Sequence, residues 1–183
     1  IDRSRGLGDV YKRQHLTCHQ RGRPVWDDAI AAFVPGTAGP AGLRSAGAAA
    51  GMFSTAAALT SGTAAAVDAL AEIGVKAKAM TLPMTEDAPF NIKAFWHVNG
   101  KGRAWLDQQN DVTVKDVRLA HQENFQSVEH LKRYTTLGMA TDQGKTSNIA
   151  GLAVMAEIAG KSIPEVGTTI YRPPYTPTAI GAF

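Results

Sequence analysis

A loop rich in glycine and hydroxyl residues has the residue types best suited to binding chemistry. The stretch HLKRYTTLGMATDQGKTSN, residues 130–148, places Gly144, Lys145, Thr146 and Ser147 directly before an apolar run. A glycine at a helix start lets backbone N–H groups converge, and a lysine adds positive charge, which together suit one phosphate group. We expect Thr146 or Ser147 to cap the helix that follows.

The loop does not match the phosphate loop of nucleotide triphosphatases. That motif follows a strand and has four residues between its first glycine and its Gly-Lys pair. Here the residues 139–143 separate the two glycines, which is one residue too many, and the preceding HLKRYTTL is typical of a helix. In the alternative interpretation, Gly138 ends a helix, Gly144 occupies a turn and Lys145 is solvated. The residues alone leave both interpretations open.

A second candidate site is SAGAAAG, residues 45–51. Gly47 and Gly51 would let the backbone approach a ligand or a neighbouring strand closely. A nucleotide site and a closely packed alanine-rich helix are both consistent with this pattern. The GxGxxG fingerprint, with its acidic residue about 20 positions later, is absent.

Other chemistry has little support in the sequence. The spacing of His97, His121 and His130 to carboxylates is not that of a metal site, and no Ser-His-Asp arrangement can be assembled. Cys18 is the single cysteine, so it can neither form an internal disulfide nor hold zinc or an iron–sulfur cluster alone. We expect no catalytic residue and no metal ligand in this chain.

Composition indicates a globular protein. The 183 residues are 44% hydrophobic, which is enough for one ordinary domain or two small ones. The chain lacks an apolar run of about 18 residues and a secretory signal profile, so we expect a cytoplasmic protein that does not bind membranes.

The first 14 residues, IDRSRGLGDVYKRQ, resemble a sequencing or cloning scar, and the alternative is a natural disordered arm. They contain four basic and two acidic residues, and so supply +2 of the formal net charge of +3. The remainder is close to neutral, and we therefore expect no nucleic-acid binding.

The hydrophobic pattern predicts a series of elements. Residues 15–75 are typical of the end of an α/β domain, with a long helix from Arg44 that is interrupted near Ser61 and Gly62. Residues 76–92 indicate a linker. The Asn99-Gly100 pair between two aromatic-rich runs predicts the turn of a β-hairpin.

Three helices and an extended exit follow. Thr113, with Asp116 three residues later, predicts the start of a helix with Val114, Val117 and Ala120 inward, and Ser127 predicts the start of a second, with Val128, Leu131 and Leu137 inward. NIAGLAVMAEIAG is apolar nearly all round, which predicts a buried third helix. Residues 164–183 contain four prolines and are expected to be extended. The predicted fold class is an α/β remnant of a nucleotide-binding domain followed by a small α+β domain, residues 93–163, of a β-hairpin plus three helices.

These motifs carry a family resemblance. Residues 111–177 closely resemble the alpha subunit of heterotetrameric sarcosine oxidase, most specifically in HLKRYTTLGMATDQGKTSN and in IPEVGTT with the later RPPYTP. GRPVWDDAIAAFVPG and RSAGAAAG also look like that subunit, so the resemblance covers residues 15–183. It implies the end of an NAD-binding domain, then the A3-like domain, then a lead into a folate-binding domain, with both ends truncated.

The resemblance also implies a function. In the family, sarcosine is oxidatively demethylated to glycine, with peroxide and 5,10-methylenetetrahydrofolate as further products. Electrons pass from FAD on the beta subunit to FMN at the alpha–beta interface, and the complex also contains gamma and delta subunits. We expect this chain to contribute to FMN and NAD binding and to subunit packing, and to be inactive in isolation.

Residue by residue, the resemblance places Thr141, Gln143, Gly144, Lys145 and Thr146 against the phosphate or the isoalloxazine edge of FMN. It places Gly47, Ala48 and Gly51 against NAD, although Ala48 stands where relatives of the nucleotide fold carry an acidic residue. Related ferredoxin-type modules hold a two-iron cluster with cysteines in segments equivalent to 104–110 and 141–148, and both segments lack cysteine here. The alternative function is a non-catalytic phosphate-binding or protein-interaction module.

Overall fold

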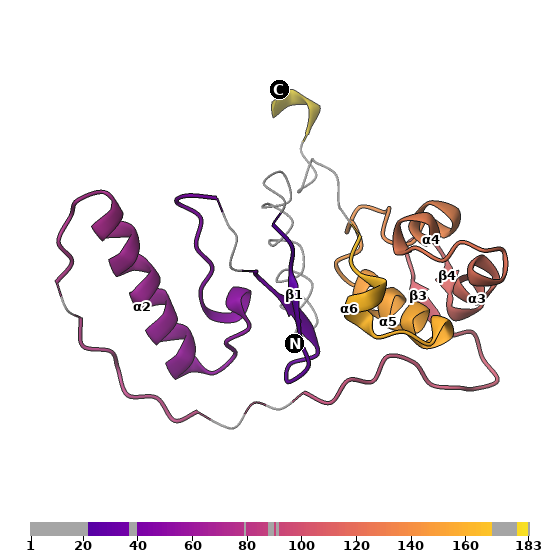
Figure 1. Cartoon of the computed structure of the whole chain (residues 1–183), viewed down its shortest axis with the longest axis horizontal. Coiled ribbons are helices and arrows are strands. Elements are labelled where there is room, and N and C mark those ends of the chain that lie inside the picture. Colours follow the sequence, from indigo (N-terminus) through magenta and orange to yellow (C-terminus); the bar gives the residue numbers. More distant parts are fainter. Residues whose placement is uncertain are drawn as a thin grey trace. The chain divides into compact units, whose positions relative to one another are not determined.

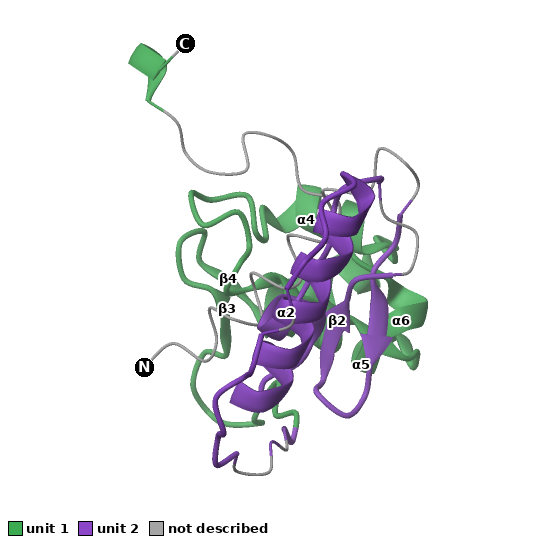
Figure 2. Ribbon diagram, turned by 90° about the vertical axis from the view of Figure 1, so that its left-hand side faces the viewer, with its two compact units in different colours: residues 1–8, 94–183 green, residues 9–93 purple. Residues whose placement is uncertain are grey.

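The computed structural model describes residues 22–36, 40–78, 80–87, 90, 92–169 and 179–182 (Figure 1). Two compact units divide the chain: residues 9–93 form one, and residues 94–183 together with 1–8 form the other (Figure 2). The suspected scar, residues 1–14, and the RPPYTP motif lie outside the described residues.

The first described element of the unit of residues 9–93 is a hairpin that the sequence interpretation missed. Strand β1, Val25–Asp27, pairs antiparallel with β2, Ala32–Val34, so that Trp26 lies opposite Phe33. The turn is stabilised by the Asp27 carboxylate, which accepts a hydrogen bond from the Ala29 amide at 2.9 Å. Residues 30–33 are buried and form the small core of this unit.

The alanine-rich run forms two helices. The 3₁₀ helix η2, Gly47–Ala50, ends at Gly51, which has the left-handed φ of 82°. Helix α2, Thr55–Glu72, then starts at Ser54, whose side chain accepts from the Ala57 amide. The predicted interruption near Ser61 and Gly62 is wrong, because left-handed Gly51 and the Ser54 cap place the break earlier.

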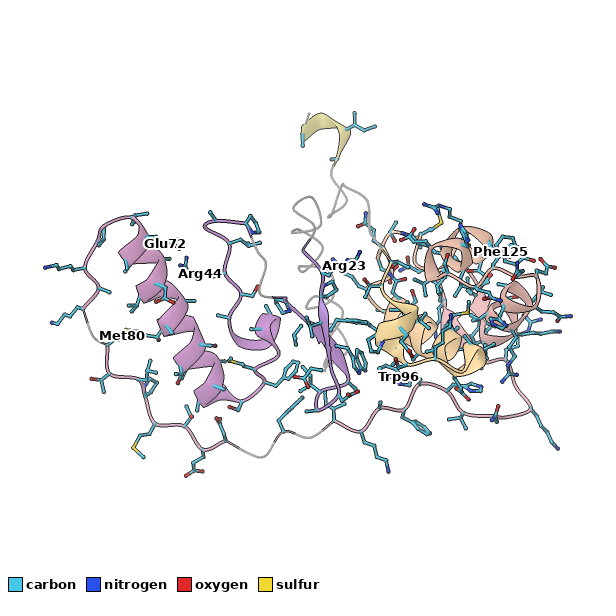
Figure 3. All side chains as sticks on the ribbon, viewed as in Figure 1. Arg23, Arg44, Glu72, Met80, Trp96 and Phe125 are labelled. Atoms are coloured by element: carbon cyan, nitrogen blue, oxygen red, sulfur yellow. The ribbon has the colours of Figure 1, made fainter. Side chains whose placement is uncertain are left out.

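Polar contacts hold α2 within its unit. Arg44 forms a bidentate pair with Glu72 at 2.9 and 2.5 Å, and Figure 3 labels both residues. The Asp87 carboxylate accepts from the first two amides of the helix, those of Thr55 and Ala56, at 3.0 and 2.7 Å. Every residue of α2 is exposed or half-buried, and these contacts join both ends of the helix to other parts of the unit.

The unit of residues 94–183 is a small α+β domain. A short hairpin of β3, Trp105–Asp107, and β4, Val112–Thr113, leads directly into α3, Val114–Gln122. Helices α4, Val128–Thr135, and α5, Asn148–Ala159, both pack against α3. The short α6, Ile163–Val166, packs on α5 (Figure 1). The last described element is the 3₁₀ helix η3, Ile180–Ala182.

The predicted turn at Asn99 and Gly100 is wrong. Residues 92–100 contain no strand, and Phe95 is 80% exposed, so its run has no apolar surface to pack on. The hairpin turn lies at residues 108–111 instead, where the Asp107 carboxylate accepts from the amides of Gln109 and Asn110. The Asp107 side chain, which accepts hydrogen bonds from two amides of the turn, favours the turn at this position.

The three predicted helices are confirmed, although Leu137, predicted on the second helix, is buried beyond the end of α4. Thr113 and Asp116 form a reciprocal capping box, and Ser127 caps α4 by accepting from the His130 amide. Helix α5 has seven buried residues, and the most buried large side chains of the unit are Val117, Leu131, Leu152, Val154 and Met155. The α+β domain is therefore confirmed, whereas the nucleotide-binding character of the first unit is not. In the described part of the chain, no helix has the length and apolarity to cross a membrane.

Candidate cofactor-binding loop

The α4–α5 loop, residues 136–147, contains all five residues predicted to face FMN, and a buried aspartate anchors it. Asp107 is 3% exposed, and its Oδ2 accepts a hydrogen bond from the Gly138 amide at 2.8 Å. The other oxygen, Oδ1, accepts from the Gln109 and Asn110 amides at 2.9 and 3.2 Å. One carboxylate thus serves the hairpin turn and the loop together.

Gln109 and Asn110 extend this connection. The Gln109 side-chain oxygen accepts from the Thr141 hydroxyl at 3.0 Å and from the Asp142 amide at 3.4 Å. The Asn110 side chain donates to the Thr136 carbonyl at 2.8 Å. The segments 104–110 and 141–148 are therefore joined by hydrogen bonds of the Gln109 side chain.

The Asn148 side chain packs against two glycines of the loop. Gly138 and Gly144 have left-handed φ angles of 68° and 75°, and a Cβ at either position would overlap the Asn148 side chain. That side chain donates to the Thr169 hydroxyl at 3.2 Å. Both glycines are required by this packing. Gly138 does not cap α4, because Thr136, with φ of 61°, is the residue that ends the helix.

The Asp142 carboxylate occupies two of the amides that could serve a phosphate. Its Oδ1 accepts from the Gly144 amide at 3.1 Å, and its Oδ2 accepts from the Thr146 amide and hydroxyl at 3.3 and 2.7 Å. The predicted cap of α5 is wrong, because Thr146 bonds to Asp142 and Ser147, at the cap position, makes no capping bond. The buried Ser147 hydroxyl has no hydrogen-bond partner among the described residues.

A pocket of about 440 Å³ lies beside the loop. Helix α4 and the loop line it with Glu129, Lys132, Arg133, Thr136, Gly138, Met139 and Gln143. Of the residues predicted to face FMN, Gln143 is in this lining, whereas Thr141, Gly144, Lys145 and Thr146 are not. The sequence interpretation missed Lys132 and Arg133, although a basic pair in the last turn before a glycine-containing loop was a usable signal.

The residues predicted to contact NAD lie in the other unit, at η2. The Gly47 amide donates to the Ser61 hydroxyl at 2.9 Å. A Cβ at Gly51 would lie 2.8 Å from the Val34 side chain and 2.9 Å from that of Ile30. Ala48 is exposed. Close packing accounts for Gly51 and the left-handed φ of 59° accounts for Gly47, so the NAD contact stays a prediction from resemblance.

The comparisons with known proteins decide the family. Residues 101–183, which include the whole loop, match the family model described as the sarcosine oxidase A3 domain. The chain is 44% identical over 172 residues to sarcosine oxidase subunit alpha of Rhizobium meliloti (strain 1021), covering 92% of this chain and 17% of the relative. The chain belongs to the sarcosine oxidase alpha-subunit family. The resemblance noted in the sequence is thereby confirmed.

Two further sarcosine oxidase alpha subunits agree. Identity is 40% over 182 residues with that of Corynebacterium sp. (strain P-1), covering 92% of this chain and 18% of the relative. It is 38% over 206 residues with that of Corynebacterium sp. (strain U-96), covering all of this chain and 21% of the relative. The chain thus spans about a fifth of the length of these sarcosine oxidase relatives, which are named as one subunit of a multi-subunit oxidase.

Proposed function

We propose that this chain forms the alpha-subunit side of an FMN site in a sarcosine oxidase. The enzyme would convert sarcosine to glycine, peroxide and 5,10-methylenetetrahydrofolate in the cytoplasm, together with beta, gamma and delta subunits. FAD would lie on beta, FMN between alpha and beta, and tetrahydrofolate on another alpha domain. The observation that carries the proposal is that the loop of the matched A3 domain borders a pocket with cations and an amide side chain.

The residues of the pocket fit a flavin. Met139 is 56% exposed and offers a polarisable apolar contact, and the Gln143 amide can donate and accept hydrogen bonds. The volume is within the usual range of cofactor pockets, about 300–1,000 Å³. FMN would supply electron transfer when bound, and these residues would hold and orient it.

The alternative, a non-catalytic interaction or phosphate-binding module, also has a specific observation in its favour. Asp142 occupies the Gly144 and Thr146 amides and the Asn148 side chain fills the space beside Gly138 and Gly144, as expected of a turn that is closed without a ligand. A contact with FMN would then have to come from the pocket side of the loop. This distinction makes Gln143 and Lys145 the residues to test, because one lines the pocket and the other does not.

The test uses the assembled complex of the alpha subunit with its partners. Gln143→Ala is expected to lower FMN content and to slow electron transfer from FAD to FMN, and Lys145→Ala to have a smaller effect in the same direction. Lys161→Ala, which removes a charge beyond the end of α5, is the matched control and should change neither. Unchanged FMN content and transfer in both loop variants would refute the assignment.

The proposed NAD contact is tested separately, because it lies in the other unit. Gly47→Val is expected to weaken NAD binding by the complex at least about tenfold while FMN content is unchanged, since a branched side chain would block close approach of the dinucleotide. Equal NAD affinity, measured by calorimetry, would remove NAD from the assignment.

A further inference from the structure

A second pocket, of about 660 Å³, lies at the start of α3, and we refer to it as the α3 groove. Residues 97–100 and 102–105, before and at the start of β3, contribute one part of its lining. Asp111, residues 113–116 and Arg118 contribute the rest. The groove shares no lining residue with the pocket at the α4–α5 loop, so the two are different pockets.

The backbone that lines the groove before β3 is open for pairing with another chain. Residues 92–100 contain no helix or strand, and Figure 1 shows this part as an open trace. Among the described residues, the amides and carbonyls of residues 94–102 have no hydrogen-bond partner. Unpaired N–H and C=O groups in an open segment readily pair with a strand of another chain.

Apolar side chains are exposed beside this backbone. Val98 and Trp105 line the groove and are 61% and 42% exposed, and Phe95, which precedes the groove, is 80% exposed. The Arg103 Cζ lies 5.6 Å from the centre of the Trp105 ring, which is a cation–π contact. Aromatic and arginine side chains contribute most often to binding energy at protein interfaces, and burial of the exposed apolar surface would favour an occupant.

Basic side chains outnumber acidic ones in the groove. Arg103, Lys115 and Arg118 line it, and none of them forms an ion pair with another described residue. Of the two lining carboxylates, Asp116 is engaged in the capping box of α3, where the helix dipole also offsets its charge. Asp111 is thus one carboxylate beside three cations, with the lining histidine counted as neutral. The groove therefore favours an anionic occupant.

We propose that the α3 groove binds an extended acidic segment of a partner subunit, which pairs as a strand with residues 97–100. Its main-chain hydrogen bonds would supply affinity, and its carboxylates would contact Arg103, Lys115 and Arg118. The relatives are named as one subunit of an oxidase, which implies a partner chain. The inference goes beyond FMN and NAD binding and takes from the proposed function the multi-subunit assembly alone. The competing explanation is a solvated face, which predicts no binding.

The first experiment titrates the whole chain with a short fluorescent peptide of alternating glutamate and valine and measures anisotropy. We expect binding that weakens at least about tenfold when lysine replaces glutamate in the peptide, because the cations then repel it. Lys115→Gln/Arg118→Gln should lose at least about tenfold in affinity for the acidic peptide. Val98→Pro, which keeps every charge but removes an amide donor, should also weaken binding.

A matched control removes the same charge elsewhere. Lys76→Gln/Lys78→Gln changes exposed positions of the other unit and should bind the acidic peptide like wild type. No binding of the acidic peptide by wild type, or equal affinity for the acidic and basic peptides, would overturn the proposal. Unchanged affinity in Val98→Pro would overturn the strand pairing.

The second experiment tests whether the segment belongs to a partner subunit. Amide exchange at residues 97–100 should be slower in the assembled complex than in the alpha subunit alone, and equal exchange would overturn the assignment to a partner. The groove variants should keep the FMN content of wild type. A complex that protects residues 97–100 but contains no FMN would refute the proposed function and support this inference.

Discussion

The Gly138 amide donates to Asp107 Oδ2 at 2.8 Å across 31 positions of the sequence, inside the buried part of the domain. This bond joins the end of β3 to the loop between α4 and α5. The same carboxylate also accepts from the Gln109 and Asn110 amides, so one side chain sets both the hairpin turn and the loop.

Removing this carboxylate should therefore destabilise the domain. In Asp107→Ala, three amides lose their acceptor, and at least the buried one at Gly138 cannot replace it with water. We expect a loss of about 2–4 kcal/mol in the free energy of unfolding, measured by urea denaturation of the purified chain. Glu157→Ala, at an exposed position of α5, should change it by less than about 0.5 kcal/mol. Equal effects of the two substitutions would contradict the anchoring role.

Helix α5 depends on a glycine for its packing. A Cβ at Gly151 would lie 2.5 Å from a terminal carbon of Leu137, which is 3% exposed and has little room to move. Gly151→Ala should lower the melting temperature, at a cost of about 1–2 kcal/mol from overpacking.

Gly62 is the matched control position for Gly151, because it is also a glycine inside a helix. It lies inside α2, and nothing in the described structure lies within 4 Å of an added Cβ there. Gly62→Ala should raise stability by about 0.5–1 kcal/mol through helix propensity. Shifts of the same sign in both variants would show that local packing does not control the effect at Gly151.

Two hydroxyls at helix starts should behave differently. Thr113 accepts from the Asp116 amide in the capping box of α3, so Thr113→Ala should cost about 1 kcal/mol. Ser147, at the start of α5, makes no capping bond, and its buried hydroxyl has no partner in the described part of the chain. Ser147→Ala should be neutral or slightly stabilising by thermal denaturation. A large loss of stability in Ser147→Ala would contradict this prediction, because it would require a hydrogen bond of the Ser147 hydroxyl.

Acidification should loosen the start of α2. The Ala56 amide, with Ser54, Thr55 and Thr85, donates to Asp87 and holds its pKa below the ordinary value of 3.8. Because the folded pKa is lowered, this contribution is complete above pH 3.8 and is lost as the pH falls through the folded value. Amide exchange at Thr55 and Ala56 should rise in that window, and Asp87→Asn should show the faster exchange already at pH 7. A pH-independent exchange difference between the two chains would contradict this.

Sequence reasoning succeeded where a short-range rule matched the packing. Thr113 with Asp116, Ser127, and the apolar run of α5 were all identified from local pattern, because capping and burial agree there. It failed at Asn99 and Gly100, where the local turn signal had no apolar surface to support a strand on either side.

The candidate site was predicted only in part. The loop residues were identified by composition and resemblance, but Asp107 and Asn148 were not, since Asp107 bonds to Gly138 across 31 positions and Asn148 to Thr169 across 21. The basic pair of α4 was also missed, although Lys132 and Arg133 are adjacent in the sequence. The run DQQND, residues 107–111, is dense in turn-forming residues and could have placed the hairpin correctly.

A structure of the assembled sarcosine oxidase complex with bound flavin tests the central claim most directly, by the distance from FMN to the Gln143 side chain. We predict hydrogen-bond contact between Gln143 and FMN. A complex in which residues 136–147 face bulk water, remote from every cofactor, would contradict the claim.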